Sequence, residues 1–133
     1  MAFSFAAIPA RCALERQAWA EAAELPLHNP AAFPWGPPYI NCDSIVHFAR
    51  AIGAARSGRT NEARAAITEL EKVQRELAGA KRAGYWASQA ETQVLAARAW
   101  VELAAKNTDE AIVTVRARGY MAGPGLSIQE AAV

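Results

Sequence analysis

The sequence predicts an all-α protein with about five helices, arranged as antiparallel hairpins in a single domain over residues 1–133. Three observations predict this fold class. Apolar residues recur at spacings of three and four along four long segments. Alternating strand patterns with turn signals are absent from the sequence. A helix–turn–helix pattern occurs twice, and its two copies lie 48 residues apart.

The first helix is predicted over residues 9–25. Pro9 suits the first turn of a helix, where a missing N–H costs nothing, and Pro26 ends it. Residues 26–43 hold five of the seven prolines, so neither a regular helix nor a central strand fits there. The segment also carries large apolar side chains, and we expect it to lie extended against the helices through them: Phe33, Trp35, Tyr39 and Ile40. A proline-rich peptide presented to a partner domain is the alternative.

The first hairpin is predicted over residues 44–78. Asp43 or Ser44 is a suitable N-cap for its first helix, and Gly58 ends that helix. Its second helix begins at Thr60 and has a regular apolar stripe. The stripe consists of Ala63, Ala66, Ile67, Leu70, Val73 and Leu77.

The second hairpin is predicted over residues 84–118, and a tail over residues 119–133 follows it. The first helix of this hairpin, from about Tyr85 to Ala105, is apolar over most of its girth, which indicates burial on more than one side. The second helix begins at Thr108 and ends before Gly119.

The repeat becomes visible when the two hairpins are aligned at an offset of 48. Ala49–Ala51 then match Ala97–Ala99, and Thr60 matches Thr108. Ala63 and Ala111 also coincide, early in the second helix of each pair. Small side chains at these positions allow the two helix axes to approach closely, because a larger residue would strain the core.

This pattern resembles the tetratricopeptide repeat, with matching positions in both copies. The first copy has Ala51, Gly58, Ala63 and Ile67, and the second has Ala99, Lys106, Ala111 and Val115. The sequence departs from the family where His47 and Leu95 stand at its tryptophan position, and in a repeat of 48 rather than about 34 residues. The chain also resembles uncharacterised bacterial repeat proteins of this type through residues 8–15, "IPARCALE", and residues 47–58, "HFARAIGAARSG".

The resemblance implies a right-handed helical stack and a non-enzymatic protein-binding or assembly module. In this family the first helices line a concave groove, which here would have a floor of Phe48, Ile52, Arg56, Gln93, Ala96 and Trp100. The partner is expected to be a protein or peptide. Repeat units need stacked neighbours to bury their apolar faces. The end formed by the last two helices is predicted to be covered by a second copy in a homodimer, by the tail, or by a partner.

The alternative is a small-molecule- or metal-binding helical protein with a pocket near His47 and Cys42. A zinc site would need Cys12 and His28 as well, but the spacings of these four residues lack a paired ligand motif. A Cys–His nucleophile pair has no accompanying oxyanion loop. The sequence therefore predicts no catalytic residue, no metal and no cofactor.

The composition excludes several further classes of function. Apolar residues make up 53% of the chain and charged residues 20%, which excludes a disordered protein. The net charge of +1 argues against a nucleic-acid partner. Four arginines lie near the first hairpin turn: Arg50, Arg56, Arg59 and Arg64. Glutamates are interleaved with them, so we interpret the arginines as part of a solvated face rather than a site for RNA or an acidic peptide.

The predicted location is cytoplasmic. No window approaches 18 uncharged apolar residues, so no membrane partner is expected. The N-terminal residues lack the positive region of an export signal, and two cysteines fit a reducing compartment.

Overall fold

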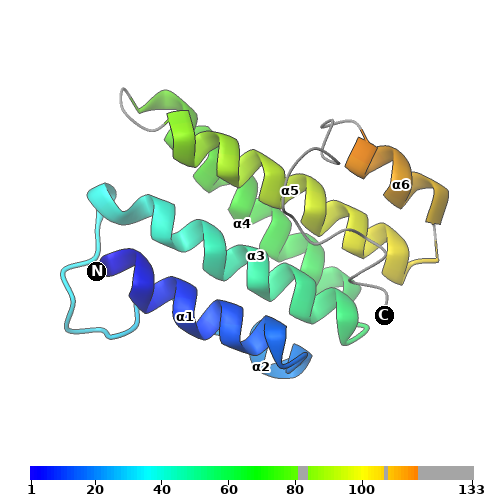
Figure 1. Ribbon diagram of the computed structural model, residues 1–133, viewed down its shortest axis with the longest axis horizontal. Helices are drawn as coiled ribbons and strands as arrows, with labels where there is room; N and C mark the ends of the chain where they lie inside the picture. Colours follow the sequence, from blue (N-terminus) through cyan, green and yellow to red (C-terminus); the bar gives the residue numbers. More distant parts are fainter. Residues whose placement is uncertain (81–83, 107, 117–133) are drawn as a thin grey trace.

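The computed structural model describes residues 1–80, 84–106 and 108–116. The predicted tail, residues 119–133, lies outside them. The elements are α1 (Ala2–Glu15), α2 (Trp19–Ala23), a 3₁₀ turn η1 (Pro37–Tyr39), α3 (Ile40–Arg56), α4 (Thr60–Gly79), α5 (Gly84–Ala104) and α6 (Thr108–Arg116) (Figure 1). The described residues contain no strand, which confirms the all-α class. None of their helices is long and apolar enough to cross a bilayer.

The helices form two hairpins beside an N-terminal helix. Helices α3 and α4 are antiparallel, and so are α5 and α6 (Figure 1). Helix α3 packs against α1, α2, α4 and α5, whereas α6 packs against α5. Helices α1, α3 and α5 run in the same direction (Figure 1). Residues 24–39 therefore return the chain from the end of α2 to the start of α3, and we call them the return segment.

The prediction of one helix over residues 9–25 is wrong at both ends. Helix α1 begins at Ala2 and contains Pro9 in its interior, and it ends at Glu15. Gln17 then adopts a positive φ of 55°, which separates α1 from the short helix α2. A stripe of alanines continues across the proline and is buried against α3, and we attribute the tolerance of Pro9 to this packing. The extra break makes six α-helices in the described residues, compared with about five predicted.

Residues 26–43 are irregular only in their first part. Helix α3 begins at Ile40, earlier than the predicted cap at Asp43 or Ser44. Ser44 instead lies inside the helix, and its hydroxyl donates a hydrogen bond to the carbonyl of Asn41 at 2.8 Å. The expected packing is present: Phe33, Trp35 and Tyr39 contact the buried cluster formed by α1 and α3.

The two hairpins share the local features that their repeat predicts. Ala63 and Ala111 are both fully buried, as the requirement for small residues between the helices predicts. At the equivalent turn positions, Gly58 has a φ of 76° and Lys106 a φ of 65°. The second hairpin therefore makes the same left-handed turn without a glycine, at the steric cost that a side chain brings to this conformation.

Candidate functional site

The residues predicted to form a groove floor come from α3 and α5, which pack side by side. The structure buries two of them: Ile52 is 3% exposed and Trp100 is 8% exposed. Phe48, Gln93 and Ala96 are half-buried. The same face therefore contributes Ile52 and Trp100 to the core of the fold, and Leu14 and Trp19 from the N-terminal region pack against the same buried cluster.

Arg56 links this face to the N-terminal helices. Its guanidinium carbon lies 4.9 Å from the ring centroid of Trp19 in α2 and 5.0 Å from that of Trp100 in α5. Stacking a cation on two indole rings is favourable because each ring presents a negative face. Sequence reasoning missed Trp19, which is 37 positions before Arg56 and belongs to no motif. Arg56 therefore lies over the ring of Trp100 on this face.

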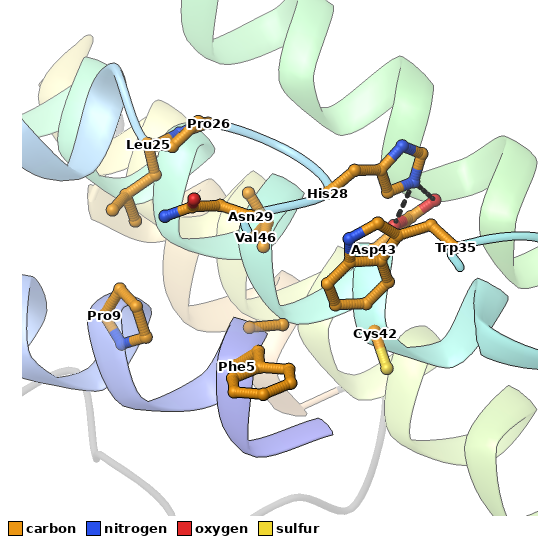
Figure 2. A pocket seen from close by; sticks show the side chains of 11 residues that line it. Phe5, Pro9, Leu25, Pro26, His28, Asn29, Trp35, Cys42, Asp43 and Val46 are labelled. Atoms are coloured by element: carbon orange, nitrogen blue, oxygen red, sulfur yellow. Dashed lines mark hydrogen bonds and ion pairs between the residues drawn. The ribbon is translucent and has the colours of Figure 1, made fainter. Parts of the chain in front are cut away.

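Cys42 lines a small cavity between α1, the return segment and α3 (Figure 2). The cavity measures about 20 Å³, which is the space for one water molecule. His28 Nε2 and Asp43 Oδ1 lie within hydrogen-bonding distance of each other at its edge, 3.1 Å apart, and the ring of Trp35 stacks on His28. Burial, followed by the charge of Asp43, raises the pKa of the Cys42 thiol. A raised thiol pKa lowers the fraction of thiolate, which is the nucleophilic form, and Cys42 packs in the buried cluster of α1 and α3.

His47 faces a different cleft, so the structure separates the two residues of the alternative pocket. This cleft of about 310 Å³ lies between α2, α3 and α4, and its polar lining residues are Glu24, His47, Arg50, Glu62 and Glu69. The side chain of His47 is buried, and its Nδ1 atom has no hydrogen-bond partner. Burial and then the charge of Arg50 lower the pKa of His47, which favours a neutral imidazole.

The remaining polar groups of this cleft are already engaged. Arg50 Nε donates to the carbonyl of Leu25 at 2.7 Å. Arg59 binds both Glu24 and Glu62, and Lys72 binds Glu69. The four residues considered for zinc do not converge either, since Cys12 is exposed on α1 while His47 and Cys42 line separate spaces. The described part of the chain holds no group of three or more metal-ligating side chains suited to a metal ion.

Helix α6 packs on α5 through one face and has exposed aliphatic side chains elsewhere. Ala111 and Val115 of α6 are buried against Ala99 of α5. On the side of α6 that turns away from α5, Ile112 is 36% exposed and Val113 is 60% exposed. The opposite end of the molecule differs, because α1, α2 and the return segment cover α3 there.

A second cleft, of about 350 Å³, separates α6 from α4. Its floor includes the buried side chains of Ile67 and Val101, and its rim carries charged residues of both signs. Arg98 and Glu71 form an ion pair across this rim, between α5 and α4. The mixed charge does not select a ligand of one sign, and the described lining includes no histidine or cysteine.

No protein-family model, curated protein or solved structure matches the chain.

Proposed function

We propose that the chain is a non-enzymatic helical assembly module of tetratricopeptide-like type, which associates with another protein chain at the end formed by α5 and α6. One observation carries the proposal: Ile112 and Val113 are exposed on α6, while the other end of the stack is covered by α1, α2 and the return segment. Apolar side chains at the end of a helical stack are stabilised by burial against a further helix. Of the three occupants that the repeat pattern leaves open, a second copy, the tail or another partner, we propose a second copy of the chain.

The cavities support a module rather than an enzyme. The enclosed one has room for a single water molecule, and its thiol has a raised pKa. The two larger clefts are open and bordered by carboxylates that are mostly paired with arginine or lysine. Such an arrangement favours a structural surface over an activated nucleophile or base.

Light scattering on a size-exclusion column, over at least a tenfold range of concentration, tests the proposal. We expect a mass above that of the monomer, and we expect Val113→Asp to return the chain to a monomer. Ile8→Asp is the matched control, because Ile8 is also an exposed aliphatic residue but lies on α1 at the covered end. A wild-type chain that stays monomeric throughout, or that loses association equally with both variants, would contradict the proposal.

A second candidate function is the binding of a small polar ligand in the cleft that His47 lines. The unpartnered Nδ1 atom of a buried imidazole favours it, since buried polar atoms are normally hydrogen-bonded. A thermal-shift screen of small polar compounds tests this candidate. Compounds that raise the melting temperature of the wild type but not of His47→Ala would support it, whereas equal shifts in both proteins would argue against it.

A further inference from the structure

Four exposed residues of α6 form one stripe along the helix: Asp109, Ile112, Val113 and Arg116. Their spacing of three, four and seven residues places them on a single face. The buried residues Ala111 and Val115 occupy the face toward α5, so the stripe is directed away from the core. Within the stripe, Ile112 lies at the edge nearest the buried residue Val115, which agrees with its lower exposure.

Along the chain, the residues of this stripe are an acid, two apolar residues and a base. Asp109 stands in the first turn of α6 and Arg116 in the last, about 10 Å apart along the axis. Neither residue forms an ion pair with another side chain of the described part of the chain. Read in the opposite direction, the pattern becomes base, apolar, apolar and acid, so the stripe is complementary to itself when two copies run antiparallel.

We propose that two copies of the chain associate through antiparallel α6 helices related by a two-fold axis between Ile112 and Val113. Asp109 of each copy then faces Arg116 of the second copy, and the aliphatic pairs meet at the centre. A two-fold interface uses the same patch on both copies, which this self-complementary stripe satisfies. A parallel arrangement would instead set Asp109 against Asp109, which is repulsive.

This inference rests on the proposed function and specifies the partner and the register. The contact is small, because α6 has nine residues and a standard interface buries about 1,200 Å² or more. We therefore expect a dissociation constant in the micromolar range or weaker, with a dimer that forms at high protein concentration.

Charge reversal tests the register. Asp109→Arg sets two guanidinium groups against each other at both ends of the interface, and Arg116→Asp sets two carboxylates against each other there. We expect each single variant to raise the dissociation constant about tenfold or more, measured by sedimentation equilibrium. An equimolar mixture of the two variants should form a heterodimer, because one end of its interface then pairs two introduced charges of opposite sign and the other end keeps the native pair. The double variant should regain self-association, because both ion pairs are restored with reversed direction.

Two controls separate this result from effects on the helix itself. Both charge reversals place a charge that is unfavourable for the helix dipole. Each chain in the mixture keeps this unfavourable charge, so association restored in the mixture would come from ion pairs between the two variants. Glu110→Arg also opposes the dipole but lies outside the stripe, and we expect it to associate like the wild type.

The outcomes distinguish the two proposals. If the wild type associates but the single reversals bind equally well, or the mixture fails to pair, the antiparallel register is overturned while the assembly function stands. If the wild type is monomeric at every concentration, both are overturned.

Discussion

Gly53 of α3 lies directly against the backbone of Trp19 in α2. A Cβ atom on Gly53 would be 2.5 Å from the carbonyl oxygen of Trp19, 2.5 Å from the nitrogen of Ala23 and 2.8 Å from the Cβ of Ala22. Contacts this short with backbone atoms cannot be relieved by rotating a side chain. Gly53 therefore allows α2 to rest on α3, and through α2 it positions Trp19 beside Arg56.

We expect Gly53→Ala to destabilise the protein. Overpacking costs about 1–3 kcal/mol, which outweighs the gain of about 1 kcal/mol that alanine brings to a helix interior. Urea denaturation followed by circular dichroism measures the change. Gly79→Ala is the control, because no atom lies within 4 Å of a Cβ there, and its stability should stay within about 0.5 kcal/mol of the wild type. Equal midpoints for all three proteins would mean that α2 does not pack on α3 as described.

Arg56→Gln is expected to lower the free energy of unfolding by about 1 kcal/mol, because it removes the cation held between Trp19 and Trp100. Arg56→Lys should retain part of this stabilisation. Arg75→Gln, an exposed change on α4, serves as the control and should have little effect. If Arg56→Gln and Arg75→Gln give the same stability in urea, the two ring contacts contribute nothing measurable.

The stability of the protein is expected to depend on the protonation of His47. Burial and Arg50 lower its folded pKa below the ordinary value of 6.5, although Asp43 and Glu69 act in the opposite direction. The unfolded chain then binds a proton at higher pH than the folded chain does. The contribution of His47 to stability is therefore complete above pH 6.5 and is lost as the pH falls through the folded pKa.

Urea denaturation at a series of pH values tests this dependence. His47→Gln should show a shallower loss of stability below pH 6.5 than the wild type, whatever its stability at neutral pH. The control His28→Gln keeps the buried imidazole of His47, so it should retain the steeper loss of stability that we attribute to His47. Identical slopes for the wild type and His47→Gln would show that His47 titrates alike in both states.

The two cysteines should differ in reactivity. Cys12 is exposed, whereas Cys42 is buried and its thiol pKa is raised. A thiol-reactive chromogenic reagent at mildly alkaline pH should therefore modify about one thiol per native chain and two after denaturation. Cys12→Ser should abolish the fast reaction. Rapid modification of Cys42 in the native Cys12→Ser variant would contradict the packing of α1 and the return segment over α3.

Much of the helical architecture follows from local sequence. The hairpins are predicted over residues 44–78 and 84–118, whereas α3–α4 span residues 40–79 and α5–α6 span residues 84–116. Residues 117 and 118 lie outside the described part of the chain. A sequence pattern can predict features that depend only on residues close in the chain. The apolar stripes, Gly58 at the turn, and the small residues Ala63 and Ala111 are of this kind. The stripe on α6 is also visible in the sequence, but its exposure is not.

The N-terminal region is where local reasoning fails. A proline is favoured in the first turn of a helix and disfavoured in its interior. Pro9 nevertheless lies within α1, and we attribute this to the packing against α3 of the alanines that precede and follow it. The groove floor stays a prediction, and it also rests on a local pattern. Periodicity places Ile52 and Trp100 on one face but does not show that Leu14 and Trp19 pack against that face.

The sequence by itself determined the helical class, the two hairpins and the small residues between their helices, because periodicity, turn residues and side-chain size are local properties. Only the tertiary structure decided which faces remain open. It placed Arg56 between Trp19 and Trp100, separated His47 from Cys42, and left Ile112 and Val113 exposed. These outcomes depend on how helices distant in sequence share a common core, and that packing is a property of the whole fold.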